Sequence, residues 1–196
     1  MAATMRFASA PGLDVIAPGL LQQEWREAEI FGAATWLWMH ASTRRETPLK
    51  WLSTLLLPAI AHRQFLLATE GDRPVFYVSW ANFSVAAENT YVNGRHSAIT
   101  PADWVSGDRQ WIIDWIAPFG HTASIWRLLQ RQLFPAHCMR YLHHHGVERG
   151  FRIKRYHGIA LNRIEADAWF AAHPVALDSN NDVAPYPPSP ESDIQI

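Results

Sequence analysis

The strongest hydrophobic pattern in the chain lies in the segment Ala102–Gly120, ADWVSGDRQWIIDWIAPFG. Its residues Trp111–Pro118 are apolar at both alternating positions, as expected of a strand that is buried on both faces of a sheet. The polar turn Ser106–Arg109 precedes this run, and Pro-Phe-Gly ends it. The pattern predicts a central strand over 111–118 that leads into a helix. Asp114 is the one charged residue inside it.

Helical and strand patterns alternate along the rest of the chain. Apolar residues three and four positions apart favour helices, and short apolar runs bounded by turn residues favour strands. The order predicts an α+β (α/β layered) fold, with a mixed, mostly antiparallel central sheet flanked by helices. The predicted helices cover residues 20–41, 48–62, 84–91, 121–134 and 165–172, and the predicted strands cover 64–69, 74–80, 111–118, 139–144 and 151–159.

The two ends of the chain differ from the middle. Residues 1–19 contain Pro, Gly and Ala without periodicity, which predicts a poorly ordered lead-in. Residues 174–196 are rich in Pro, Asp and Ser with little to bury, which is typical of a disordered tail. A single domain is therefore expected over residues 20–173.

Composition narrows the classes of protein that fit. A formal net charge of -1 argues against a general nucleic-acid binder, which carries a basic surplus. The one cysteine, Cys138, excludes an internal disulfide framework and suits a reducing compartment. The first residues lack the apolar region of a signal peptide, and no run of about 18 apolar residues occurs. The expectation is a soluble, cytoplasmic protein without a membrane span.

Asp114 is the first candidate for a functional residue. An ionised carboxylate between Ile113 and Trp115 is costly unless it is paired or hydrogen-bonded. One interpretation is a structural Asp held by backbone amides or by an Arg. The other is part of a proton-handling site, since desolvated carboxylates gather at such sites.

Other polar motifs carry weaker signals. The triplet His143–His145 does not predict a metal site, because neighbours in a strand point to opposite faces. The turn Ser106–Arg109 exposes backbone amides of the kind that hold anions. His40 lies four residues after Trp36 and four before Arg44, so a continuing helix would place His40 and Arg44 one turn apart. No motif for a covalent nucleophile or a phosphate-binding loop is present.

Four segments together resemble one known family. They read TrpLeuTrp at 36–38, LeuProAlaIle at 57–60, ProValPheTyrValSerTrpAlaAsn at 74–82, and the run of residues 103–120, AspTrp-x-SerGlyAspArg-x-Trp-x-x-AspTrp-x-AlaProPheGly. Their order and spacing are similar to those of the RTX-toxin-activating lysine acyltransferases, the hemolysin-activating family. The resemblance runs from about Ile30 to about Phe134, and a weaker similarity continues to Gly158.

The resemblance implies a fold similar to the GNAT acetyltransferases. It implies that a fatty acyl group moves from acyl carrier protein to the ε-amine of an internal lysine of a protoxin, in the cytoplasm. The 4'-phosphopantetheine thioester of the carrier would be a cosubstrate, and no cofactor would stay bound. The expected partners are acyl carrier protein and a protoxin or smaller precursor peptide. An acyl-CoA donor and a homodimer are left open.

The family's chemistry implies specific site residues. A lysine ammonium must lose a proton before it attacks a thioester. The resemblance implies a His as general base and an Asp on the central strand to support it, and the matching Asp is Asp114. At the position of the family's His this chain has Arg44, and Ala41-Ser42 replace the preceding Ser-Pro. An arginine stays protonated and cannot serve as a base.

Three interpretations of this departure remain open at the level of the sequence. His40 replaces the usual base, with Asp114 as the second catalytic residue. Alternatively, Asp114 or water suffices, and Arg44 anchors an anion or the thioester oxyanion. In the third, Arg44 and Asp114 form a buried ion pair, and the protein binds an acyl carrier or peptide without turnover. The residues expected to contact substrate or carrier are Arg44, Trp38, Arg109, Ser106 and Gly107.

Overall fold

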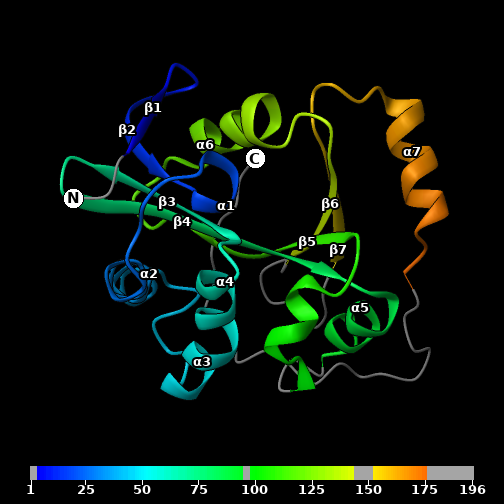
Figure 1. Cartoon of the computed structure of the whole chain (residues 1–196), viewed down its shortest axis with the longest axis horizontal. Coiled ribbons are helices and arrows are strands. Elements are labelled where there is room, and N and C mark those ends of the chain that lie inside the picture. The colour runs from blue at the N-terminus through cyan, green and yellow to red at the C-terminus, as the bar shows by residue number, and fades with distance from the viewer. Residues whose placement is uncertain (1–3, 95–97, 144–151, 176–196) are drawn as a thin grey trace.

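The computed structural model describes residues 4–94, 98–143 and 152–175, which form a seven-stranded sheet flanked by helices (Figure 1). The strand order is β1-β2-β3-β4-β5-β6-β7, and every neighbouring pair is antiparallel except β5 and β6. The fold is therefore α+β with a mixed, mostly antiparallel sheet, as the sequence predicts. No helix within these described ranges is both long enough and apolar enough to cross a membrane.

The strands agree closely with the hydrophobic pattern. The predicted central strand is β5 (Arg109–Ile116), which is paired with β4 (Arg73–Phe83). The other predicted strands are β3 (Phe65–Glu70), β6 (Cys138–His143) and β7 (Arg152–His157). Five of the six residues from Arg109 to Asp114 are under 8% exposed, which accounts for the lack of alternation in this part of the sequence.

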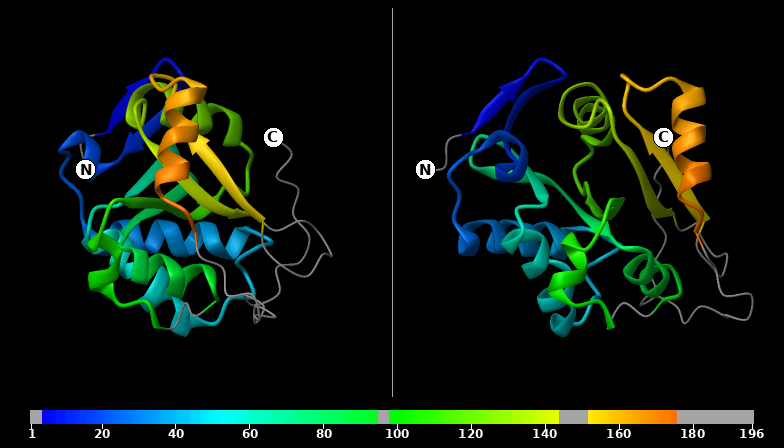
Figure 2. Two further views of the ribbon diagram at one scale, coloured as in Figure 1. Left: turned by 90° about the vertical axis from the view of Figure 1, so that its right-hand side faces the viewer. Right: turned by 45° about the vertical axis from the view of Figure 1, so that its right-hand side comes forward.

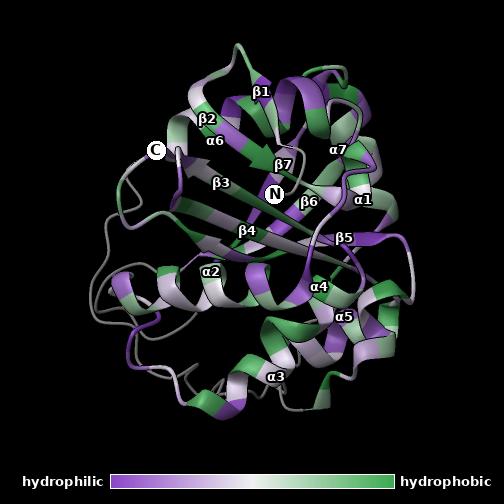
Figure 3. Ribbon diagram, turned by 60° about the vertical axis from the view of Figure 1, so that its left-hand side comes forward, coloured by the Kyte–Doolittle hydropathy of each residue, from purple (hydrophilic) through white to green (hydrophobic). Residues whose placement is uncertain are grey.

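The helices form two layers, one on each face of the sheet. One face is covered by α2 (Glu27–His40), α3 (Leu52–Leu55), α4 (Leu57–Ala61) and α5 (Val85–Val92). Figure 3 shows α2 lying along this face beneath β4. The other face is covered by α1 (Pro18–Leu21), α6 (Thr122–Leu128) and the π-helical turn η4 (Leu129–Leu133). Each layer closes a separate hydrophobic cluster, so the sheet is buried on both sides.

Helix α7 (Arg163–Ala172) stands apart from these layers. It packs through Ala166 and Phe170 on the start of β6, at the opposite end of the sheet from β1 and β2 (Figure 2). Its N-terminus carries a capping box in which Asn162 and Glu165 each accept a hydrogen bond from the other's backbone amide.

The N-terminal segment differs from the prediction of a poorly ordered lead-in. It contains β1 (Met5–Phe7) and β2 (Ala10–Ile16), and β2 pairs with β3. Leu13 and Val15 are buried at 1% and 0% exposure. Gly12, at φ +79°, and Pro11 interrupt the apolar alternation of β2, which is why the sequence pattern does not display it.

The first two predicted helices are each divided. Gln22 adopts a left-handed conformation at φ 52° and ends α1, so the segment predicted as one helix over 20–41 begins its long helix only at Glu27. The segment predicted over 48–62 consists of the short turn η1 (Leu49–Trp51), α3 and α4. Pro58 lies in the first turn of α4, where a missing N–H costs nothing, whereas it would interrupt one continuous helix.

A β-bulge distorts β5 next to Asp114. Ser79 faces Asp114, but the next residue of β4, Trp80, faces Ile112, so Ile113 is the extra residue. Pairing between β5 and β6 is confined to Trp111 with Arg140 and Ile112 with Tyr141, and it ends at the residue before the bulge. The bulge therefore marks the point where β5 turns away from its parallel neighbour.

Candidate functional site

The carboxylate of Asp114 lies in the layer between β5 and α2. Asp114 is 1% exposed, and its Oδ1 accepts a hydrogen bond from the guanidinium of Arg44. The side chain of Arg44 is 10% exposed and that of Asp114 0%, so both charges are almost fully withdrawn from water. Two residues that stand 70 positions apart in the sequence are thus brought together as a buried ion pair.

The chain segment after α2 delivers Arg44 to this position. The helix ends at Ala41, and the amide of Arg44 donates to the carbonyl of Ala41 at 3.0 Å in the following turn. The guanidinium of Arg44 lies 5.1 Å from the centre of the Trp38 ring. The buried indole of Trp38 therefore supports the cation through its π-face, while the guanidinium meets Asp114.

Several buried polar atoms around Asp114 have no partner at standard hydrogen-bond geometry in the described part of the chain, although Trp38 still interacts with Asp114, and Ser79 with Tyr77, through weaker side-chain hydrogen bonds. These atoms are Asp114 Oδ2, Trp38 Nε1, Tyr77 Oη and Ser79 Oγ. Burial raises the pKa of Asp114, and Arg44 opposes that rise. Burial, followed by the charge of Asp114, raises the pKa of Tyr77 well above its ordinary value. Incompletely satisfied polar groups around a carboxyl with a perturbed pKa are characteristic of functional sites.

His40 occupies a different environment from Asp114. It is exposed at the end of α2, where its ring lies 4.0 Å from Trp36 and 5.7 Å from Phe119, measured between ring centres. Its Nδ1 lies 2.8 Å from the carbonyl oxygen of Trp36. Because a carbonyl only accepts, Nδ1 carries the proton in this contact and Nε2 keeps its lone pair. The structure brings Arg44, and not His40, into contact with Asp114.

The Ser106–Arg109 turn makes contacts within the protein. The hydroxyl of Ser106 accepts a hydrogen bond from the amide of Ser84 at 2.8 Å and donates one to the carbonyl of Asp103 at 2.8 Å. The amide of Gly107 donates to the carbonyl of Asn82 at 3.0 Å. These bonds fasten the start of β5 to the end of β4. The expected role of Ser106, Gly107 and Arg109 in binding substrate or carrier stays a prediction.

Arg109 belongs to a buried charge cluster that the sequence pattern does not reveal. Glu88 of α5, at 0% exposure, accepts hydrogen bonds from Arg109, from Trp111 Nε1 at 2.8 Å and from Arg140 at 3.3 Å. The two guanidinium groups also donate to the carbonyls of His173 and Pro174 after α7. The cluster joins β5, β6, α5 and the end of α7. The one sequence signal for this cluster is Arg109 itself, a charged residue at the start of an otherwise apolar strand.

No group of three or more His, Cys, Asp or Glu side chains capable of holding a metal occurs among the described residues. Of the triplet His143–His145, only His143 is described, at the end of β6, and the other two lie outside the described ranges.

Comparison with known proteins identifies the family. The model of the RTX toxin acyltransferase family matches residues 23–157, which is more than half of the chain. The protein belongs to the RTX toxin acyltransferase family. The matched region contains α2, the Arg44 turn and strands β3 to β7, and so it includes the whole environment of Asp114.

Individual relatives support the same assignment. The protein-lysine myristoyltransferase HlyC of Escherichia coli is 35% identical over 142 residues, covering 72% of this chain and 82% of HlyC. The RTX-I toxin-activating lysine-acyltransferase ApxIC of Actinobacillus pleuropneumoniae is 34% identical over 151 residues, covering 77% and 87%. The leukotoxin-activating lysine-acyltransferase LktC of a Pasteurella haemolytica-like species (strain 5943B) is 44% identical over 93 residues, covering 47% of this chain and 56% of LktC.

Proposed function

We propose that this protein is a lysine acyltransferase that moves a fatty acyl group from acyl carrier protein to the ε-amine of an internal lysine in an RTX-type protein or precursor peptide. The observation that carries the proposal is the buried carboxylate of Asp114 at the bulge of β5, among polar atoms with incomplete hydrogen bonding, in a chain of this family. Relatives that are 34% to 35% identical to this chain are named for lysine acylation, which supports the reaction class.

The reaction forms one C–N bond and breaks one C–S bond. The lysine ammonium gives up a proton, and the free amine attacks the thioester carbonyl to give an intermediate with a protonated nitrogen and an oxyanion. This nitrogen loses a second proton as the intermediate collapses to an amide and a thiolate, so one of the two released protons is left over for solvent once the thiolate is protonated. The thiolate then takes up a proton. The protein must accept the ammonium proton and stabilise the oxyanion. Arg44 cannot accept a proton, but its guanidinium can stabilise negative charge.

His40 is the side chain that we propose as proton acceptor. Its contact with the Trp36 carbonyl directs the lone pair of Nε2 away from the helix, and the ring is accessible from solvent. In this arrangement Asp114 acts through Arg44 as a positioning residue, because it fixes the guanidinium beside Trp38. Acyl-CoA is the alternative donor, and competition between acyl carrier protein and acyl-CoA separates the two.

Coexpression with a candidate acceptor tests the proposal. Intact-mass measurement of the acceptor should detect the addition of one acyl chain on lysine when the wild-type protein and acyl carrier protein are present. His40→Gln should reduce the modified fraction strongly, and Asp114→Asn should also reduce it. His157→Gln changes an exposed histidine on β7, and it should leave the modification unchanged. Full modification with both His40→Gln and Asp114→Asn would contradict the proposed roles.

A second function is favoured by the Arg44–Asp114 ion pair itself. With an arginine where the family resemblance places a histidine, the protein binds acyl carrier protein or peptide without turnover. Under this function the wild-type protein gives no mass gain, whereas Arg44→His restores modification. If the wild-type protein modifies the acceptor and Arg44→His lowers the yield, the binding-only function is excluded.

A further inference from the structure

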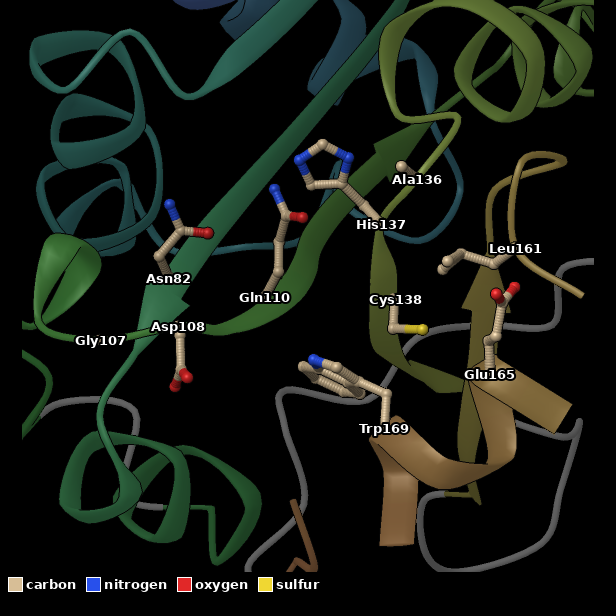
Figure 4. Close-up of a pocket in the computed structure, with 10 residues that line it drawn as sticks. All are labelled: Asn82, Gly107, Asp108, Gln110, Ala136, His137, Cys138, Leu161, Glu165 and Trp169. Carbon is tan, nitrogen blue, oxygen red and sulfur yellow. The ribbon is translucent and has the colours of Figure 1, made fainter. Parts of the chain in front are cut away.

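A cavity of about 380 Å³ lies where the starts of β5 and β6 approach α7 (Figure 4). It shares no lining residue with the environment of Asp114 and Arg44. The β5–β6 pairing begins only at Trp111 and Arg140, so the strands leave a gap before that point. The residues lining the cavity are Asn82, Gly107, Asp108, Gln110, Ala136, His137, Cys138, Leu161, Glu165 and Trp169.

Two carboxamide side chains face this cavity from neighbouring strands. Asn82 and Gln110 are directly opposed in the β4–β5 register. Gln110 is only 7% exposed, yet its side-chain amide has no hydrogen-bond partner among the described residues, and Figure 4 shows it directed into the cavity toward His137. This amide is open to the cavity and is available to a water or a ligand. Carboxamides offer both donors and acceptors, as a peptide group requires.

The charges around the cavity favour a cation. Asp108 and Glu165 supply two carboxylates, and the described lining contains no lysine or arginine. Glu165 Oε2 accepts the amide of Asn162 at 2.8 Å, and Asp108 lies 3.4 Å from the ring of His173. Behind Trp169 lies Arg140, which shares the carboxylate of Glu88 with Arg109, so this buried cluster keeps one positive charge behind the wall of the cavity. Partial burial lowers the pKa of His137, which keeps that imidazole neutral.

The remaining wall is apolar. Leu161 lies beside Glu165 on one side of the cavity, and the indole of Trp169 lies between Glu165 and Asp108 (Figure 4). The cavity wall thus has an apolar part and an acidic part. A lysine or arginine side chain matches both, because its hydrocarbon stem packs on apolar surface and its charged end pairs with carboxylates.

We propose that this cavity binds a basic peptide segment. A lysine or arginine side chain lies along Trp169 with its charge at Asp108, and the adjoining peptide group bonds to Asn82 and Gln110. Glu165 adds negative charge from the opposite wall. The inference concerns binding at a second site, and it stands independently of acyl transfer at Asp114.

Titration of the full chain with Nα-acetyl-lysine N-methylamide, followed by two-dimensional ¹H–¹⁵N NMR, tests the proposal. Saturable shifts are expected in the indole N–H of Trp169 and in the side-chain amides of Asn82 and Gln110. The norleucine analogue has the same stem without the charge, and it should bind about fivefold more weakly because it cannot pair with a carboxylate.

Variants separate the cavity from the general surface. Gln110→Ala should weaken binding of the lysine probe about tenfold, and Asp108→Asn, which changes an exposed carboxylate, about threefold. Asp167→Asn removes a carboxylate of α7 that does not line the cavity, so it should leave the affinity unchanged. Equal binding of the norleucine probe, or equal loss in Asp167→Asn and Asp108→Asn, would overturn the proposal. The fold of Gln110→Ala is checked by its backbone spectrum, and Asp108→Asn changes a side chain that is 80% exposed.

Discussion

At the scale of single residues, the ion pair of Arg44 with Asp114 controls the character of the site. A buried pair is costly to desolvate, and removing one partner leaves the other charge unpaired in a medium of low polarity. Burial already raises the pKa of Asp114 in the presence of Arg44. Without the cation, the carboxylate would lose the interaction that opposes this rise.

Arg44→Met should therefore destabilise the protein by about 3 to 5 kcal/mol at neutral pH, measured as the free energy of unfolding in urea. The loss depends on pH. A carboxyl whose pKa is raised in the folded state favours folding below its unfolded pKa, and this contribution is lost as the pH rises through the folded pKa. The deficit of Arg44→Met should accordingly shrink at about pH 5, closer to the ordinary pKa of an aspartate.

Arg45→Met provides the matched control. Arg45 is next in the sequence and pairs with Glu46 at 3.5 Å, but both side chains are more than half exposed. Its loss should cost about 1 kcal/mol or less, with little dependence on pH. A deficit of Arg44→Met that is as small as that of Arg45→Met, or that grows at low pH, would show that the buried pair does not act as described.

The sequence predicts one half of this pair and leaves the other half open. Asp114 stands out because it interrupts an apolar strand, whereas its partner comes from a turn 70 residues earlier. The periodicity within each element carries no information on which elements meet. Glu88 was not predicted as a buried charge for the same reason, since a glutamate in a short helix is ordinarily exposed.

At the scale of elements, Gly107 lies in the turn Ser106–Arg109, which connects η3 (Pro101–Val105) to β5. This turn packs closely against the end of β4. A Cβ atom at Gly107 would lie 2.5 Å from the carbonyl oxygen of Phe83 and 2.7 Å from the Cα of Ser84. Both contacts are with backbone, which cannot rotate away. Only a glycine permits this approach of the two chain segments.

Gly107→Ala should cost about 1 to 3 kcal/mol of stability through overpacking. Gly32→Ala is the comparison, because Gly32 lies inside α2 with no atom within 4 Å of the added Cβ. That substitution should stabilise the protein by about 1 kcal/mol through helix propensity. Thermal unfolding should show a lower midpoint temperature for Gly107→Ala and a higher one for Gly32→Ala. An unchanged midpoint in Gly107→Ala would exclude close packing at the turn.

Element boundaries show where sequence patterns fail. The strands β3 to β7 were predictable because apolar runs bounded by turn residues are local signals. The predicted helix over 20–41 is divided because Gln22 adopts a left-handed backbone conformation. A glutamine in the sequence does not predict that conformation. The predicted helix over 121–134 continues from α6 into η4, and this change from α to π geometry leaves the apolar spacing almost unaltered.

At the scale of the whole molecule, the N-terminal strands complete the sheet. β2 covers the edge of β3, and its side chains Leu13 and Val15 enter the cluster closed by α6. Leu13→Ala should lower the free energy of unfolding by about 2 to 5 kcal/mol. Met5→Ala, at a residue of β1 that is 42% exposed, should change it by about 0.5 kcal/mol or less. If urea unfolding gave the same small change in free energy for both variants, the N-terminal segment would not contribute to the hydrophobic core.

The buried carboxylate of Glu88 has a consequence for how the molecule comes apart. In the described residues the strand register between β5 and β6 has only two residue pairs, so hydrogen bonding between strands alone would let β6, β7 and α7 detach while the rest stayed folded. Detachment would break the hydrogen bond of Arg140 with Glu88. It would also break the bonds of Arg109 and Arg140 with the carbonyls after α7. Detachment would also expose Met139 and Tyr156 of the second hydrophobic cluster to water, so the two parts of the sheet should melt together, as one cooperative unit.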